Sequence, residues 1–440
     1  MTISRRAASL SRTFVATAMG ASLVAGCGAL PGGSAASGGP GATITVMTFA
    51  PEGTKATNMP GMTGMAKAYE RWVNANGGIN GHRLRVLTCN EKNTPSGAAD
   101  CARKAVAEKA VAVVGSYSQH GRAFMAPLET EGIPFIGGYG VSSEEFQSPL
   151  SYPVNGGQAV LIAGAGHQLG RVCDQVALVR PDTIPGDILP VLLNAGLRAN
   201  KMADAADIRA AEDSADFMPQ ATEALAHTTG TGKEKEKEKE KEKEKEKGCV
   251  TAILGERTET FFDAFRRTEP QRKKPQISSV LGSVSQSLVD RTGGRESPFE
   301  GAYLTSWYPV SSDPAWEPMR KVVTEFAFGD DTVDPDDTGA QTTWIAYTVL
   351  SEIVKRFEKG EDIDAGKVKR SLNEAQPVRT GGLTPDLSWR YQDMRAVAGF
   401  PRIVNGQVTF QIVQSGRLVA QPGEQSLDMT KTLEQAPRTA

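Results

Sequence analysis

The chain has little of several residue types on which whole classes of site depend. It contains only five cysteines and four histidines among 440 residues. The histidines are scattered and no two cysteines have the Cys-x-x-Cys spacing, so the ligand pattern of a zinc site is missing. A formal net charge of −2 gives no general attraction to nucleic acid or to anionic lipid. We therefore expect a protein that works without metal, cofactor or nucleic acid.

The sequence also lacks the short motifs of common catalytic sites. It has no Gly-x-Ser-x-Gly, no phosphate-binding glycine loop ending in Lys-Ser or Lys-Thr, and no cluster of histidines with carboxylates. The stretch GDDTVDPDDTG places Asp334, Asp336 and Gly339 much as a calcium loop would, but Ile345 stands where the closing glutamate is needed. We interpret these acids as the N-terminal cap of a helix that follows, and we do not expect an enzyme.

No apolar run is long enough to cross a bilayer, which takes roughly 20 residues. Arg5, Arg6 and Arg12 precede the short apolar stretch FVATAMGASLVAG and then Cys27, in the order of an export signal. The segment LVAGC resembles the lipobox of bacterial lipoproteins, which implies that Cys27 is lipidated and becomes the first mature residue. The alternative is an ordinary signal peptide with a chance cysteine, and the export route stays open. We expect a signal peptide at 1–26 and a Gly/Ser/Ala/Pro tether at 27–41.

Export places the remaining cysteines in an oxidising environment. Cys89, Cys101, Cys173 and Cys249 form an even set that allows three pairings. Closeness along the chain favours Cys89–Cys101, which leaves Cys173–Cys249.

Apolar runs typical of strands alternate with helical patterns along the mature chain. ATITVMTF, HRLRVLTC, AVAVVG, IPFIGG, VALVR, VTAILG, QISSVLG and GAYLTSW favour strands, and the segments between several of them favour helices, one of them capped by Ser96. This alternation predicts parallel sheets in an α/β fold, with ligands at the carboxyl ends of the strands. The strict Lys/Glu repeat at 233–247 has no apolar face and favours a solvated loop inserted between two elements.

The segment VNANGGINGHRLRVL, together with EGIPFIGG, EGAYLTSWYPVSSDPAW and TTWIAYTVLSEIVKRFEKG, resembles the type I periplasmic binding proteins of the Leu/Ile/Val-binding group. The resemblance implies two Rossmann-like lobes with parallel sheets, joined by a hinge of three crossovers. It assigns 42–157 and 309–386 to the N-terminal lobe and 158–308 and 387–425 to the C-terminal lobe, with a tail at 426–440. It also implies a small ligand held between the lobes.

The same resemblance places one half of a ligand site on the N-terminal lobe. Hydroxyl and backbone N–H groups in GSYS would hold a ligand carboxylate, and GGYG would add a backbone wall with a covering tyrosine. The alternative for both is ordinary turn chemistry. The residues concerned are Ser116, Tyr117, Ser118, Gly138, Tyr139 and Gly140.

The other half of the site is less well defined by the resemblance. Amino-acid binders of the family place an acid after the strand that matches QISSVLG, whereas this chain has Leu281, Gly282 and Ser283 there. Glu256, after VTAILG, is a substitute by position, and its alternative is a solvated surface residue. Tyr308 is a candidate wall of the cleft or a core residue.

These implications combine into one functional hypothesis. We expect a monomeric lipoprotein on the outer face of the cell membrane that captures an amino acid or a related carboxylate or amide. It would deliver this ligand to an ABC permease and its ATPase. The alternatives are a sensory receptor with the same fold that signals to a membrane kinase and, more distantly, an exported hydrolase or scaffold built on this fold.

Overall fold

The computed structural model describes residues 41–440 except 56, 212–213, 230–246, 269–274, 281–283, 375, 396, 398 and 437–440. The expected signal peptide, all but the last residue of the expected tether and almost all of the Lys/Glu repeat fall outside the described residues. Within the described ranges, no helix is both long and apolar enough to cross a membrane.

The first lobe is built on a five-stranded parallel sheet in the order β2-β1-β3-β4-β5. Both faces of β1, which lies between β2 and β3, are buried, because Ile44 and Val46 pack into one apolar cluster while Met47 and Phe49 pack into another. A strand that is covered on both faces has a nearly continuous apolar sequence, and β1 has such a sequence. The strands are β1 (Gly41–Ala50), β2 (His82–Asn90), β3 (Ala112–Val114), β4 (Phe135–Ile136) and β5 (Ser151–Tyr152).

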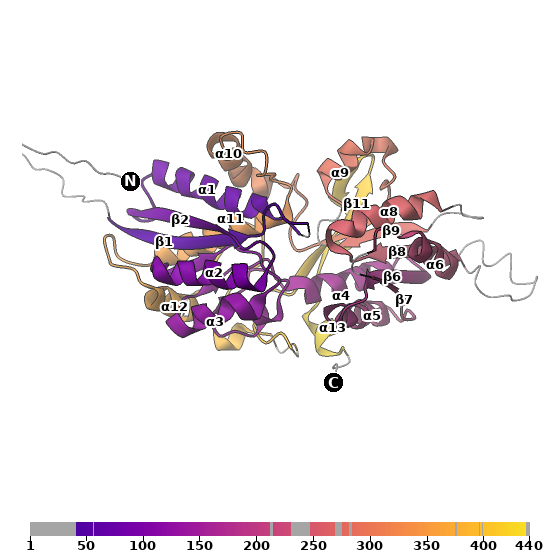
Figure 1. Ribbon diagram of the computed structural model, residues 1–440, viewed down its shortest axis with the longest axis horizontal. Helices are drawn as coiled ribbons and strands as arrows, with labels where there is room; N and C mark the ends of the chain where they lie inside the picture. The colour runs from indigo at the N-terminus through magenta and orange to yellow at the C-terminus, as the bar shows by residue number, and fades with distance from the viewer. Residues whose placement is uncertain are drawn as a thin grey trace, which may run out of the picture. The chain divides into compact units, whose positions relative to one another are not determined.

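Helices of the first lobe lie on both faces of this sheet (Figure 1). Side chains of α2 and α3 pack with Met47 and Phe49, while those of α1 and α11 pack with Ile44 and Val46 on the opposite face. The helices are α1 (Pro60–Ala75), α2 (Pro95–Ala107), α3 (Gly121–Glu131), α10 (Glu317–Phe326), α11 (Thr338–Val354) and α12 (Ala365–Glu374).

Two helix starts test expectations from the sequence. Helix α2 is capped by Thr94, whose hydroxyl accepts from Gly97 N at 3.0 Å, so the prediction of Ser96 was wrong. Pro95 fixes the first helical φ and lacks an N–H, which puts the cap one residue before it. At α11 the acidic interpretation is confirmed, because the Asp337 carboxylate accepts from Ala340 N at 2.8 Å. Asp334 bonds only locally, accepting from Asp336 N at 2.8 Å.

The second lobe contains a mixed sheet in the order β12-β11-β10-β9-β8-β6-β7, with β13 paired to β11. Strands β6 to β10 are parallel, as predicted, but β11 runs antiparallel to β10, β12 and β13. The strands are β6 (Gln175–Pro181), β7 (Ala206–Ala210), β8 (Gly248–Ala252), β9 (Gln276–Val280), β10 (Tyr303–Ser306), β11 (Gln407–Gln414), β12 (Arg417–Ala420) and β13 (Ser426–Asp428).

Helices flank this sheet on both faces too. Leu161 of α4 and Leu193 of α5 share a cluster with Leu178, whereas Ala221 of α6 and Phe261 of α8 share another with Val179, the next residue along β6. Because successive strand residues point to opposite faces, the two helix pairs lie on opposite sides. The helices are α4 (Gly157–Gly170), α5 (Ile188–Ala199), α6 (Met218–Thr229), α8 (Thr258–Arg267), α9 (Gln286–Arg291) and α13 (Thr430–Glu434).

The chain passes between the lobes three times, at residues 153–156, 307–313 and 388–406. The predicted fold class, two Rossmann-like lobes with a hinge of three crossovers, is therefore confirmed. Two predicted boundaries differ from the structure. Trp389 and Arg402 donate to Pro153 O and Ser151 O beside the first sheet, so the segment after residue 387 still packs on the first lobe. Strand β13 and helix α13 occupy the expected tail.

Both expected disulfides are present. Cys89–Cys101 ties the end of β2 to α2, and Cys173–Cys249 ties the segment after α4 to β8, across a sequence separation of 76. Cys101, Cys173 and Cys249 are buried. The pairing chosen from closeness along the chain is thus confirmed.

Candidate functional site

The two loops of the first lobe that carry the predicted site residues lie at the carboxyl ends of adjacent strands. Ser116, Tyr117 and Ser118 follow β3, and residues 138–140 follow β4. Tyr139 N donates to Ser116 O at 3.0 Å, and the rings of Tyr117 and Tyr139 lie 5.3 Å apart. The fold therefore brings the six residues predicted for this lobe together at one edge of the sheet.

The two serines of this group use their hydroxyl groups inside the protein. Both are buried. Ser116 Oγ accepts from Phe49 N at 3.0 Å, and Ser118 Oγ donates to Glu91 Oε2 at 3.1 Å while it accepts from His120 N. The proton of the Ser118 hydroxyl is thus directed at a carboxylate of the protein.

Glu91, which the sequence reasoning did not name, lies in contact with this group of residues through Ser118. Its side chain is fully buried just after β2, and it also accepts from Asn93 N at 2.9 Å. Burial raises the pKa of Glu91, although the hydrogen bonds from Ser118 and Asn93 oppose the rise. Its place directly after a predicted strand was the available signal, because that position lies at the ligand-binding edge of a parallel sheet.

Tyr139 links the two loops to the second crossover. Its ring packs edge-on against Trp307 at 5.2 Å, and its side chain is almost completely buried. Burial and then the charge of Asp337 raise the pKa of Tyr139 well above its ordinary value. Trp307, which was not predicted, donates through Nε1 to Gly157 O at 3.0 Å and so fixes the crossover against the start of α4.

Tyr308, a predicted site residue, is buried within the hinge. Asn155 Nδ2 lies 3.1 Å from its hydroxyl and Thr342 Oγ1 lies 3.0 Å from it, so Tyr308 joins the first crossover to α11. Burial raises the pKa of Tyr308 to about 12. The structure brings Tyr308 close to the first-lobe loops through Trp307, with which it is in ring contact at 6.1 Å.

The second-lobe half of the site is only partly described. Glu256 lies in a short 3-10 helix, η3 (Gly255–Arg257), after β8, and its side chain is outside the described residues. The loop at 281–283, which lacks the acid that the family resemblance leads one to expect, is also outside them. Among the residues that the structure describes, no group of three or more His, Cys, Asp or Glu side chains could hold a metal ion.

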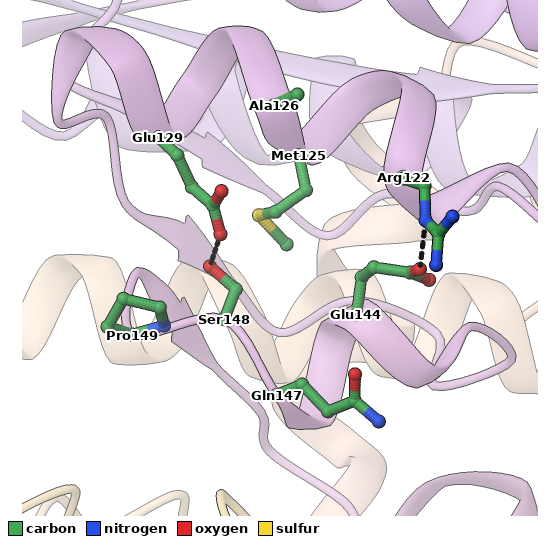
Figure 2. A pocket seen from close by; sticks show the side chains of 8 residues that line it. All are labelled: Arg122, Met125, Ala126, Glu129, Glu144, Gln147, Ser148 and Pro149. Carbon is green, nitrogen blue, oxygen red and sulfur yellow. Dashed lines mark hydrogen bonds and ion pairs between the residues drawn. The ribbon is translucent and has the colours of Figure 1, made fainter.

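Two cavities lie away from these loops. One of about 270 Å³ lies on the first lobe between α3 and the segment before β5, where Arg122 faces Glu144 at 3.7 Å and Ser148 bonds Glu129 (Figure 2). The other, of about 360 Å³, is bordered by residues of the third crossover and β13, including Arg395 and Asp428. Neither is lined by a predicted ligand-binding residue.

Comparisons with solved structures show the same fold. A possible leucine/isoleucine/valine-binding protein from Rhodopirellula baltica aligns with a TM-score of 0.66 and 12% identity over 90% of this chain and 98% of that one. A solute-binding protein of an ABC transporter from Rhodopseudomonas palustris, in complex with p-hydroxybenzoic acid, aligns with a TM-score of 0.66 and 15% identity. The alignment covers 90% of this chain and 99% of that one. A substrate-binding periplasmic protein from Ralstonia solanacearum aligns with a TM-score of 0.63 and 17% identity, over 85% of this chain and 99% of that one.

A search of curated proteins gave no match. Comparison with protein families, by contrast, matches residues 44–401 to the periplasmic binding proteins. This match includes residues of both lobes and the first two crossovers and ends within the third, and it agrees with the resemblance to the type I, Leu/Ile/Val-binding group. The chain therefore belongs to the periplasmic binding protein family and is a solute-binding protein, not an enzyme.

Proposed function

We propose that the protein is an exported receptor that captures a small polar ligand between its lobes and delivers it to an ABC import permease driven by an ATPase. The observation that carries the proposal is the contact of Tyr139 with Trp307 at 5.2 Å. It joins the strand-end loops, where ligands collect in such sheets, to a crossover between the lobes. Similar solved structures include solute-binding proteins of ABC transporters, which supports the transport assignment.

The crossovers supply the hinge that such a receptor needs. Trp389 Nε1 and Asn405 Nδ2 of the third crossover donate to Pro153 O and Val154 O of the first, at 2.9 and 3.0 Å. Side chains therefore hold the crossovers to one another while the lobes keep separate sheets. Closure about a few such residues is a common response to ligand, and the permease would recognise the closed form.

The hydrogen bonds of Ser118 bear on the chemistry of the ligand. Because its hydroxyl donates to the buried Glu91 at 3.1 Å, a ligand carboxylate next to Ser118 would meet a second carboxylate. Like charges in a desolvated site are costly. A ligand that presents an amide or ammonium group here, such as an amino acid or a related amide, would instead find an acceptor in Glu91.

A thermal-shift screen tests this function. We would screen amino acids, short amides and carboxylates, including 4-hydroxybenzoate, because a ligand that binds only the folded protein raises the melting temperature. A hit should lose its shift in Tyr139→Ala and keep it in the control Tyr391→Ala, which alters a side chain that is 91% exposed. Equal shifts in both variants would place the ligand elsewhere.

A further inference from the structure

Glu145 is a buried carboxylate that the proposed ligand site does not use directly. Its side chain is 2% exposed and lies in the 3-10 helix η1 (Ser143–Phe146), after the loop that carries Tyr139. Oε1 accepts from Val141 N at 3.0 Å, from Ser142 N at 2.9 Å and from Ser142 Oγ at 3.0 Å, and Oε2 accepts from Gly140 N at 2.9 Å. Three consecutive backbone N–H groups thus donate hydrogen bonds to one side chain.

Only part of this arrangement is needed to start η1. Ser142 and Glu145 form a capping box, in which the glutamate accepts from the N-cap N–H. The bonds from Val141 and Gly140 lie upstream of the cap and belong to the loop after β4. The carboxylate therefore does more than cap a helix, since it also holds the loop that leads back to Tyr139.

The loop passes so close to Glu145 that there is no room for a side chain at position 138. A Cβ on Gly138 would lie 2.0 Å from Glu145 Oε2 and 2.2 Å from a ring carbon of Phe135. Tyr139, between Gly138 and the bonded Gly140, packs its ring on Tyr117 and Trp307. Any movement of the carboxylate is therefore transmitted to Tyr139.

We propose that Glu145 is a positioning residue, which sets the place of Tyr139 in the ligand site by holding the N–H groups of Gly140 and Val141. The inference rests on the proposed function, because it assigns Glu145 a role in binding only if Tyr139 lies at the ligand.

The ionisation of Glu145 adds a pH dependence to this role. Burial raises its pKa from the ordinary 4.5 to about 7, against the opposing effect of its hydrogen bonds. The held loop thus binds a proton more tightly than an opened loop, so opening becomes easier as pH rises from about 4.5 to about 7, by up to roughly 100-fold. The charged or titratable groups on η1 and on the elements packed around it are Tyr117, Arg122, Glu129, Glu131, Glu144, Tyr152 and Arg402.

Glu145→Gln separates positioning from capping. A glutamine that turns its oxygen to the position of Oε1 keeps the bonds from Val141 N, Ser142 N and Ser142 Oγ. Its NH₂ group then faces the N–H of Gly140, which loses its acceptor. At pH 5, where the glutamate of the held loop is protonated and both side chains are uncharged, we expect hydrogen exchange at Gly140 and Tyr139 to become at least about 10-fold faster in the variant, while that of η1 changes little. Ser142→Ala, the matched control, should loosen η1 and leave Gly140 protected.

The pH dependence of loop opening distinguishes the proposed role of Glu145 from a purely structural one, which would not depend on its charge. After correction for intrinsic exchange rates, opening at Gly140 should increase between pH 5 and pH 8 in the unaltered chain and stay flat in Glu145→Gln. Unchanged protection of Gly140 in Glu145→Gln, or a variant profile parallel to that of the unaltered chain, would overturn the proposal. If exchange behaves as expected but Tyr139→Ala still binds the screened ligand, Glu145 positions the loop and the proposed ligand site is the part that fails.

Discussion

At the scale of single residues, Tyr139 is the side chain on which the proposed site depends most. It contacts Tyr117 in its own lobe and Trp307 in the second crossover, with ring distances of 5.3 and 5.2 Å. Ser116 and Ser118, by contrast, direct their hydroxyls into the protein. The aromatic contact, more than the serine hydroxyls, is therefore what this loop pair offers to a ligand.

Tyr139→Ala should reduce both stability and binding. Removing a buried ring costs about 3 kcal/mol or more in the free energy of unfolding, and the wall between loop and crossover is lost with it. Tyr139→Phe keeps the ring and should stay within about 1 kcal/mol. Urea unfolding and calorimetric titration with the screened ligand measure the two effects. Equal stability of the alanine variant and the unaltered chain would contradict the packing described here.

At the scale of elements, caps and cross-links decide where helices start and how strands are held. Proline preferences place Pro95 at the first turn of α2, so the residue before it must supply the cap. The sequence reasoning chose a good capping residue at the wrong position, because Thr94 and Ser96 are both chemically able to cap and only backbone geometry separates them.

Thr94→Ala should destabilise the protein by about 1 kcal/mol, the usual effect of losing a side-chain cap. Ser96→Ala should have little effect, because the α2 cap bond is made by Thr94 at 3.0 Å. Urea unfolding of the two variants side by side provides the measurement. A larger loss of stability in Ser96→Ala than in Thr94→Ala would show that Ser96 is the cap.

Asp337 makes the start of α11 sensitive to pH. Burial raises its pKa from 3.8 to about 6. The folded state then binds a proton that the unfolded state has released, so stability should fall as pH rises from about 3.8 to about 6. Because the side chain is partly exposed, we expect a loss of only about 1–2 kcal/mol. Asp337→Asn keeps a capping side chain and should lack this slope in urea unfolding at pH 4 and pH 7. Identical slopes would contradict the assignment.

The Cys173–Cys249 disulfide holds β8 beside the segment after α4, directly after the Lys/Glu repeat. The double variant Cys173→Ala/Cys249→Ala should lose about 2–5 kcal/mol of stability, because the cross-link closes a long loop. Denaturant unfolding measures the loss, and non-reducing peptide mapping should find the two cysteines in one peptide pair. Recovery of both as free thiols would refute the pairing.

At the scale of the whole molecule, the lipobox-like segment before Cys27 predicts a membrane anchor. Cys27→Ala should move the protein from the membrane fraction to the soluble fraction, since the lipidated cysteine is the proposed anchor. Fractionation followed by immunoblotting checks this, with the unaltered chain as reference. Retention of the variant on membranes would exclude Cys27 as the anchor.

Much of the fold could be predicted because its signals are local. Apolar runs such as HRLRVLTC coincide closely with β2 (His82–Asn90), and glycine turns and helical spacing mark the elements between strands. The antiparallel β11, the strand β13 and the packing of residues 388–406 on the first lobe could not be predicted, because pairing partners far apart in sequence decide them.

By itself, the sequence determined the alternating α/β pattern and the loops at the strand ends, since both follow from neighbours along the chain. It favoured one of the three cysteine pairings through the closeness of Cys89 and Cys101. Only the tertiary structure decided which side chains those loops meet. Three residues could not be recognised from the sequence, namely Glu91, Glu145 and Trp307. Their partners are distant in sequence or they lie in segments with the composition of turns, and their burial is seen only in the folded chain. A buried carboxylate needs donors, and that need is what reveals the roles of Glu91 and Glu145.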